Sequence, residues 1–353
     1  MGSILFFGHG KTEMRGGPAI FMSLYNQWPN NKKYMIYEKS YLQSLKKLFV
    51  FLRHREVSML ILENEYFTEV FIALLLKIFN RKLSVYGPAY HIPSSPVFGK
   101  GFINSMIHYV DYQLGLWSMA HIYSGIYTEN SYMKNYIEHL NPKQNVIVES
   151  PGIREKNIIS LDKMKTLDRD IDFLYLTSMT KNKGIYDFLE IIKQLQQEHK
   201  DVKVCIAGYA SNEVLDYINA FVKNNNIKNI EIYHDIDERQ KYKLYSRSKI
   251  YVLPSIEDGI PITFYEAWSS GNIVIAYKLE TYSDIADYFV GVERGNINNL
   301  IQECKNVYRD YNVYFDQFVE KSHDYSMKHS YEGGIEKIIE SIRESSTSIN
   351  RGR

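Results

Sequence analysis

Short apolar runs of strand length alternate with longer helix-periodic runs along almost the whole chain. This alternation is typical of β-α-β units, in which helices connect parallel strands and cover the sheet. The pattern therefore predicts an α/β protein built from Rossmann-like parallel sheets, one in each half of the chain. The runs with strand character are Ile4–Phe7, Tyr34–Tyr37, Ser58–Leu62, Leu83–Tyr86, Ile122–Tyr127 and Val146–Glu149, then Phe173–Leu176, Val202–Ala207, Ile230–Tyr233, Ile250–Leu253 and Ile273–Ala276.

The chain has 353 residues, which is more than one hydrophobic core usually organises, so we expect two domains. From Ser150 to Asp168 the alternation is broken by Pro151, Gly152 and mixed charges, which is typical of a linker. We expect an N-terminal Rossmann-like domain over residues 1–165 and a second over residues 166–325. Residues 326–353 are expected to form a C-terminal helix that could pack back on the first domain and a disordered tail from Ser345 to Arg353.

Composition and cysteine usage indicate a globular protein of the cytoplasm. Hydrophobic residues make up 45% and charged residues 24% of the chain, which are ordinary values for a soluble domain. Cys205 and Cys304 lack the spacing of a zinc site or a disulfide framework, which favours a reducing compartment. The run from Ser3 to Phe7 is too short for a signal peptide, and Val70–Phe79 is too short to span a membrane.

Positive charge is concentrated in the first half of the chain. Residues 1–165 carry 19 Lys and Arg against 12 Asp and Glu, whereas the remainder carries 23 against 29. A basic half could face an anionic membrane or a phosphate-bearing acceptor, although a solvated surface explains it equally simply. The stretches Ser44–Arg55 and Val97–Met119 could lie on a membrane surface, or cover the sheet as ordinary amphipathic helices. No pattern of a nucleic-acid-binding module is present.

A glycine-rich turn follows the first strand-like run. Phe7-Gly8-His9-Gly10 is followed by Arg15-Gly16-Gly17-Pro18, just before a predicted helix. Glycines leave backbone N–H groups accessible, and a helix N-terminus favours negative charge, so this turn could hold a phosphate or a sugar hydroxyl. An ordinary tight turn is the alternative. An ordinary P-loop is excluded because its first glycine would have to stand at Leu5.

The sharpest motif lies between a predicted strand and a predicted helix, from Pro254 to Ala267. Asp258 and Glu266 are two carboxylates separated by seven residues, and Gly259 and Ile260 offer backbone N–H groups near the helix start. Carboxylates accept hydrogen bonds from sugar and ribose hydroxyls, and open parallel sheets bind ligands at the carboxyl ends of their strands. The alternative is that Asp258 caps the helix and Glu266 makes a surface ion pair.

This segment resembles the signature of retaining glycosyltransferases of family four, the glycosyl transferases group 1. Asp258-Gly259-Ile260-Pro261 stands where that family has a Glu-Gly-Phe-Gly or Glu-Gly-Phe-Pro turn, and Glu266-Ala267 matches its end. Asp258 replaces the family's glutamate, and Glu257 beside it does not preserve the spacing. The resemblance implies the GT-B fold, in which two Rossmann-like domains face each other across a cleft.

Further residues acquire expected roles through the resemblance. The segment Leu174–Gly184 resembles the loop whose lysine neutralises the donor diphosphate, here Lys183, although Ser178 stands where many members have an arginine. Glu266 would bind the ribose, and Asp258, an expected catalytic residue, would face the donor sugar. The other implied donor-binding positions are Gly259, Ile260, Pro261, Gly16, Gly17 and Gly208. His91 is the expected catalytic histidine and His9 its alternative.

The resemblance implies a metal-independent hexosyltransferase without a cofactor. Two Asp-x-Asp patterns, Asp168–Asp170 and Asp235–Asp237, are expected to be incidental, so we predict no metal ligands. The implied partners are a nucleotide-diphosphate sugar and a glycan or lipid-linked acceptor, as in polysaccharide biosynthesis, with peripheral contact at the inner face of the membrane. A nucleotide-sugar 2-epimerase of the same fold and a catalytically decayed sugar- or nucleotide-binding protein remain alternatives.

Overall fold

The computed structural model describes residues 3–9, 17–29, 33–52, 56–90 and 102–351. The chain forms two compact units, one of residues 1–151 with 332–353 and one of residues 152–331. Each unit contains a six-stranded parallel sheet, so the predicted α/β class is confirmed. The division at residues 151 and 152 falls earlier than the expected boundary at 165, because the segment expected to be a linker folds onto the second unit.

The sheet of the first unit has the strand order β2-β1-β3-β4-β5-β6. All of its strand pairs are parallel. The start predicted for its fifth strand, Ile122, is wrong, because that residue ends the preceding helix. The strands are β1 (Ser3–His9), β2 (Lys33–Glu38), β3 (Val57–Leu62), β4 (Ser84–Pro88), β5 (Gly125–Thr128) and β6 (Val146–Val148).

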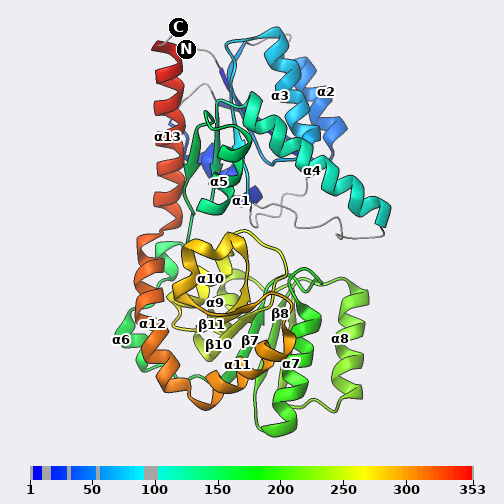
Figure 1. The fold of residues 1–353 in the computed structure, drawn as a ribbon, viewed down its shortest axis with the longest axis vertical. Coiled ribbons are helices and arrows are strands. Elements are labelled where there is room, and N and C mark those ends of the chain that lie inside the picture. The colour runs from blue at the N-terminus through cyan, green and yellow to red at the C-terminus, as the bar shows by residue number, and fades with distance from the viewer. Residues whose placement is uncertain (1–2, 10–16, 30–32, 53–55, 91–101, 352–353) are drawn as a thin grey trace. The chain divides into compact units, whose positions relative to one another are not determined.

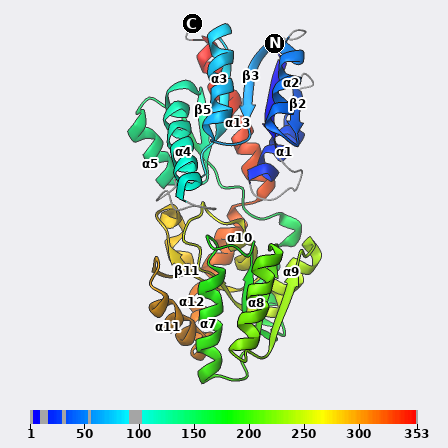
Figure 2. The same ribbon diagram turned by 90° about the vertical axis from the view of Figure 1, so that its right-hand side faces the viewer.

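Helices cover both faces of this sheet (Figures 1 and 2). Leu5 and Phe7 point into a core shared with α2 to α5, whereas Phe6 between them contacts Phe21 of α1 on the opposite face. Helix α13 also packs on the first unit, where Tyr86 and Ser345 share a hydrogen bond of 3.0 Å between their hydroxyls. The helices are α1 (Gly17–Gln27), α2 (Tyr41–Leu52), α3 (Phe67–Phe79), α4 (Phe102–Ile122), α5 (Ser131–Leu140) and α13 (Tyr331–Arg351).

The C-terminal segment differs from the expectation of a disordered tail. Helix α13 continues to Arg351, so that expectation is wrong for the described residues. The helix places Ile335, Ile338 and Ile342, spaced three and four residues apart, on one buried face. Burial of this face accounts for a helix much longer than the apolar pattern alone indicates.

The sheet of the second unit has the order β12-β11-β10-β7-β8-β9. Five of these strands were predicted, and the sixth, β12, was missed because it is only four residues long. Its order reverses at β7, since β8 lies on one side of that strand and β10 on the other. The strands are β7 (Ile171–Leu176), β8 (Val204–Gly208), β9 (Ile230–His234), β10 (Ser248–Leu253), β11 (Ile273–Lys278) and β12 (Val290–Glu293).

The expected linker contributes two short helices to the second unit. Met164 of α6 is buried in the same core as α7 and α11, and the N–H of Ile159 donates to the carbonyl of Ser269 at 3.2 Å. The helices of this unit are η1 (Glu155–Asn157), α6 (Leu161–Lys165), α7 (Ile185–Glu198), α8 (Asn212–Asn224), α9 (Glu238–Arg247), α10 (Ile262–Ser269), η2 (Glu280–Tyr288), α11 (Ile297–Arg309) and α12 (Tyr311–Lys328). Among the helices of the described residues, none is long and apolar enough to cross a membrane.

Candidate active site

Two loops of the second unit meet where the strand order reverses. One follows β7 and the other follows β10, and the connections from these neighbouring strands lead in opposite directions. The N–H of Ile256 in the second loop donates to the carbonyl of Asn182 in the first at 2.9 Å. Parallel sheets bind ligands at such a switch point, outside the carboxyl ends of the strands. This edge of the second sheet is therefore the candidate active site.

Lys183 and Asp258 meet at this edge although 75 residues separate them in the chain. The Lys183 ammonium forms an ion pair with the Asp258 carboxylate, and the Ser255 hydroxyl donates to the same carboxylate at 3.2 Å. The N-cap of α10 is Pro261, and no side chain caps the helix. The capping role considered for Asp258 is therefore wrong, and its carboxylate faces the other loop instead.

Glu257 is the second carboxyl group of this turn. Burial, together with the neighbouring Asp258 carboxylate, raises the pKa of Glu257 to about 8. One of its carboxyl oxygens, Oε2, is buried and has no hydrogen-bond partner in the part of the chain that the structure describes. Burial therefore favours the neutral form of the Glu257 carboxyl group.

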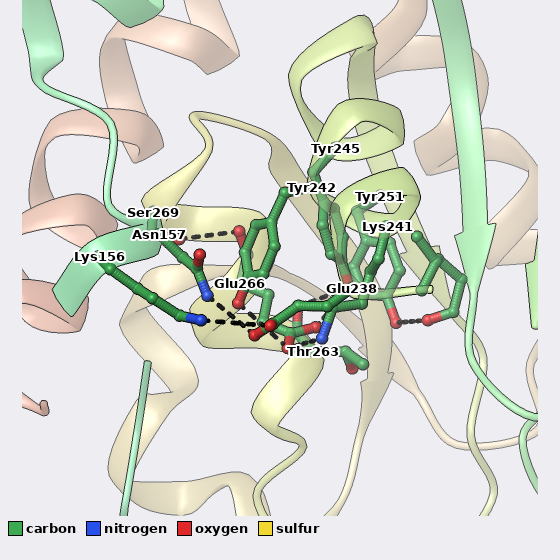
Figure 3. Close-up of polar contacts among 11 residues, drawn as sticks. Lys156, Asn157, Glu238, Lys241, Tyr242, Tyr245, Tyr251, Thr263, Glu266 and Ser269 are labelled. Carbon is green, nitrogen blue, oxygen red and sulfur yellow. Dashed lines mark hydrogen bonds and ion pairs between the residues drawn. The ribbon is translucent and has the colours of Figure 1, made fainter. Parts of the chain in front are cut away.

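Glu266 lies on α10 with its carboxylate buried among donors from α9 (Figure 3). Its Oε1 pairs with the ammonium of Lys241, and its Oε2 accepts a hydrogen bond of 3.2 Å from the hydroxyl of Tyr245. The side chain of Glu266 is 7% exposed, so the surface ion pair considered from the sequence is wrong. Burial, and next the Glu266 charge, raise the pKa of the Tyr245 hydroxyl well above its ordinary value.

The partners of Glu266 were not predicted from the sequence. Lys241 and Tyr245 are four residues apart on α9, and this spacing places both side chains on one face of a helix. Tyr242 adds a third donor, whose hydroxyl lies 3.4 Å from Oε1 of Glu266. A second ion pair, between Lys156 and Glu238 at 3.3 Å, lies beside this network in Figure 3. The four-residue spacing of Lys241 and Tyr245 is visible in the sequence, but it does not indicate that their partner lies on α10.

Gly208 fits the same edge of the sheet. Its φ is 140°, and a Cβ at this position would lie 1.9 Å from the carbonyl oxygen of Thr177. The N–H of Met179 donates to the carbonyl of Tyr209 at 2.7 Å, which joins the loops after β7 and β8. Gly259, Ile260 and Pro261 occupy the turn between Asp258 and α10, where Ile260 is 4% exposed. The predicted donor-binding positions of the second unit therefore gather at one edge.

One aspartate of each Asp-x-Asp pattern has a structural role. Asp170 binds Arg247 through two hydrogen bonds of 2.8 and 2.7 Å. Asp237 caps α9 by accepting a hydrogen bond of 2.7 Å from the N–H of Gln240. In the described ranges, no group of three or more His, Cys, Asp or Glu side chains is arranged to hold a metal ion.

The first unit has its own switch point, between β1 and β3. Three buried carboxylates follow β3, and each accepts a hydrogen bond. Tyr37 donates to Glu63 at 2.8 Å, Tyr112 to Glu65 at 2.6 Å, and the Asn64 amide to Glu69 at 3.1 Å. This cluster was not predicted from the sequence, although Glu63-Asn64-Glu65 directly after a strand was a usable signal. Such fixed carboxylates can accept hydrogen bonds from hydroxyl groups.

The predicted residues of the first unit are only partly within the described structure. Gly17 begins α1, and His9 ends β1, which places both near the carboxyl end of the first strand. His91 and Gly16 lie outside the described residues. The predicted catalytic histidine is therefore not placed relative to the three buried carboxylates.

Gly184 is expected to be intolerant of any side chain. It has a φ of 74°, and a Cβ would lie 2.0 Å from the carbonyl oxygen of Pro254, so alanine must push the two site loops apart. We expect Gly184→Ala to lower the free energy of unfolding by about 2–4 kcal/mol, measured by urea denaturation. Gly295→Ala is the matched control, because Gly295 has a φ of 78° but no atom within 4 Å of the added Cβ. Its cost should be only about 1–2 kcal/mol, and an equal cost for both variants would contradict close packing of the loops.

The comparisons with known proteins concern the same region. Residues 156–316 match the model of the family described as glycosyl transferases group 1. The match covers the loops that carry Lys183 and Asp258, and helix α10, which carries Glu266. No curated protein sequence matches the chain significantly.

Solved structures establish the fold over nearly the whole chain. HepE of Anabaena, in complex with UDP-glucose, has a TM-score of 0.75 at 9% identity over 99% of this chain and 100% of that one. WaaG, a glycosyltransferase involved in lipopolysaccharide biosynthesis, has a TM-score of 0.72 at 12% identity over 96% of this chain and 99% of that one. The chain therefore has the GT-B fold.

A longer structure resembles only part of this chain. TarM of S. aureus, in complex with UDP and other ligands, has a TM-score of 0.60 at 17% identity. The match covers 80% of this chain but 55% of TarM, so the chain spans about half the length of that protein.

Proposed function

We propose that this chain, whose residues 156–316 form a glycosyl transferases group 1 domain within a GT-B fold, is a retaining glycosyltransferase. It transfers a hexose from a nucleotide-diphosphate sugar to a glycan or lipid-linked acceptor. The observation that carries this proposal is that Lys183 and Asp258 meet at the switch point of the matched domain. Glu266 lies on α10, the helix that follows the Asp258 turn. Polysaccharide biosynthesis is the process that fits such an acceptor.

Each site residue has a role in this proposal. Glu266 accepts hydrogen bonds from the ribose hydroxyls while Lys241 and Tyr245 hold its carboxylate in place. The ammonium of Lys183 moves from Asp258 to the donor diphosphate, which leaves the Asp258 carboxylate to face the sugar. The N–H groups of the turn at Gly259 and Ile260 are further donors to the sugar. Lys183 therefore exchanges one negatively charged partner, the Asp258 carboxylate, for another, the diphosphate of the donor.

The chemistry requires stabilisation of a leaving phosphate. As the glycosidic bond breaks, negative charge grows on the diphosphate, and a fixed cation such as Lys183 stabilises that charge where it develops. We propose that this charge replaces a metal ion and that the reaction needs no cofactor. For retention, the acceptor oxygen attacks from the face that the phosphate leaves, and the phosphate takes the acceptor proton. His91 is the proposed catalytic histidine facing the donor sugar.

We propose that the acceptor binds to the first unit. Glu63, Glu65 and Glu69 lie at that unit's switch point and could bind acceptor hydroxyl groups.

We also propose that the reaction takes place in the cytoplasm. Cys205 and Cys304 are both buried free thiols, and burial raises the pKa of Cys205 to about 12. Unreactive free cysteines of this kind fit a reducing compartment.

Nucleotide binding is the first test. A ligand at one hundred times its dissociation constant stabilises a protein by about 2.7 kcal/mol, so binding is readable as a rise in melting temperature. UDP is the first candidate, because HepE and TarM are described in complex with UDP or its sugar, and GDP, ADP and CMP serve as comparisons. We expect one of these nucleotides to raise the melting temperature equally with EDTA and with magnesium.

The same assay separates the alternatives. If no nucleotide or nucleotide sugar raises the melting temperature, the donor site is wrongly assigned. Binding without turnover in the presence of varied acceptors would instead indicate a decayed site. Release of an epimerised free sugar from the donor, without any acceptor, would indicate the 2-epimerase reaction.

A further inference from the structure

Helices α3 and α4 are apolar on the face that points away from the core. On α4 the exposed side chains fall three, four or seven residues apart and form one stripe along most of the helix, and on α3 they do the same. These two helices pack against each other, and α2 belongs to the same helix layer (Figures 1 and 2). We define the apolar face by its exposed residues, which are Phe71, Leu75, Ile78 and Phe79 of α3, and Ile103, Met106, Ile107, Val110, Leu114 and Trp117 of α4.

The core does not need this face. The opposite sides of the same helices already fill the hydrophobic core, with Val70 and Ala73 of α3 and Leu116 and Met119 of α4 all completely buried. Ile103 is 74% exposed and Phe79 is 87% exposed. Large contiguous apolar patches are rare on monomeric soluble proteins and mark interaction surfaces. Helix α2 of the same layer also exposes apolar side chains, at Leu42, Phe49 and Val50.

The exposed charged side chains of α2 and of the loop after α3 are basic. Lys46 and Lys47 lie exposed on α2, and Arg81 and Lys82 lie exposed just after α3. The sequences of α2, α3 and α4 contain two acidic residues, Glu69 and Asp111. Glu69 is completely buried, and half-buried Asp111 accepts hydrogen bonds from the backbone of Phe67 and Thr68. Lys47 forms an ion pair with Glu38, so Lys46, Arg81 and Lys82 supply the positive charge beside the face.

We propose that the apolar face docks on a membrane surface that contains anionic lipid. Apolar side chains of helices that lie in the plane of a bilayer enter the boundary between headgroups and acyl chains, and flanking Lys and Arg side chains bind anionic headgroups. A protein partner or a second copy of the chain would also cover apolar residues. The excess of basic side chains beside the face favours an anionic bilayer, because a self-complementary dimer would bring these like charges together. This proposal extends beyond the catalytic reaction and stands independently of it.

Trp117 gives the experiment a built-in reporter. The chain contains three tryptophans, of which Trp28 is 4% exposed, Trp268 is 0% exposed and Trp117, on the apolar face, is 55% exposed. We expect vesicles of phosphatidylcholine mixed with phosphatidylglycerol to shift the emission of the full-length protein to shorter wavelength. Vesicles of phosphatidylcholine alone should shift it much less. Trp117→Phe should abolish the shift while co-sedimentation with the mixed vesicles persists.

Two double variants separate the apolar and the basic contributions. Ile107→Asp with Val110→Asp should lower partitioning into mixed vesicles by roughly tenfold or more, and Val313→Asp, at an equally exposed apolar site of α12, should leave it unchanged. Arg81→Gln with Lys82→Gln should lower it by roughly tenfold, whereas Lys200→Gln with Lys328→Gln, exposed lysines of the second unit, should not. Nucleotide-induced thermal shifts should stay unchanged in all four variants.

Three results would overturn the proposal. The first is wild-type protein that neither co-sediments with mixed vesicles nor changes its Trp117 emission. The second is equal loss of partitioning in the control variants. The third is a wild-type dimer in light scattering that Ile107→Asp with Val110→Asp converts to a monomer without any vesicle binding, because this face would then be a subunit interface. A failed nucleotide shift with intact vesicle binding would count against the proposed function and leave the docking surface standing.

Discussion

Replacement of Lys183 by methionine is expected to reduce sugar transfer about a hundred- to a thousandfold while the protein remains folded. Methionine keeps most of the apolar stem but removes the charge that faces the leaving diphosphate. The ion pair with Asp258 is partly accessible, with side-chain exposures of 26% and 15%, so its loss should lower the free energy of unfolding by only about 1 kcal/mol. Steady-state kinetics and a melting curve on the same preparation measure both effects.

Lys181→Met is the matched control for this variant. Lys181 lies exposed two residues earlier in the same loop, so its replacement tests whether any nearby positive charge would serve. We expect less than about a threefold change in transfer, because an exposed charge in water is strongly screened. Loss of activity in Lys181→Met but not in Lys183→Met would show that the diphosphate binds to the other lysine.

Glu266→Ala should be the more disruptive substitution for the fold. It would leave the Lys241 ammonium and the Tyr245 hydroxyl without the carboxylate that they bind in a site where Glu266 is only 7% exposed. Removal of one partner from such a pair costs about 3 kcal/mol of unfolding free energy or more. Glu266→Gln keeps the shape and one acceptor oxygen, so it should retain most of the stability but weaken nucleotide binding about tenfold or more.

Two further variants show whether this network accounts for the effect. Combining Glu266→Ala with Lys241→Met removes both charges, and we expect it to recover part of the lost stability in urea denaturation. Glu238→Gln breaks an ion pair whose glutamate side chain is 47% exposed, so it should cost less than about 1 kcal/mol. If the double variant were no more stable than Glu266→Ala alone, the stranded Lys241 charge would not be the cause.

Much of the architecture could be predicted from local patterns. The strands β7, β10 and β11 begin and end within about two residues of their predicted limits, because continuous apolar runs bounded by polar residues are typical of buried parallel strands. β12 escaped detection since four residues carry too little pattern to distinguish a strand from a loop. The helical character of α13 up to Arg351 was also missed, because its polar last turns show no apolar periodicity.

Individual residues of the site were predicted from the sequence, but the pairs that they form were not. Asp258 stood out because a charged residue next to a glycine, after a strand and before a helix, is a local arrangement, and Lys183 was identified through the family resemblance of its loop. Lys241 did not stand out, because a lysine within a polar helix is ordinary until the partner helix is known. Glu63, Glu65 and Glu69 were likewise overlooked, since only burial distinguishes these carboxylates from solvated ones.

The sequence by itself determined the type of most elements and the approximate limits of most strands, because hydrophobic periodicity and turn chemistry act over a few residues. The tertiary structure alone decided which of these residues meet. Lys183 and Asp258 are 75 residues apart, and Lys241 and Glu266 are 25 apart, and both pairs form because β7 and β10 are neighbours and α9 packs against α10. Strand order and helix packing depend on the simultaneous burial of many apolar side chains, which no single segment specifies.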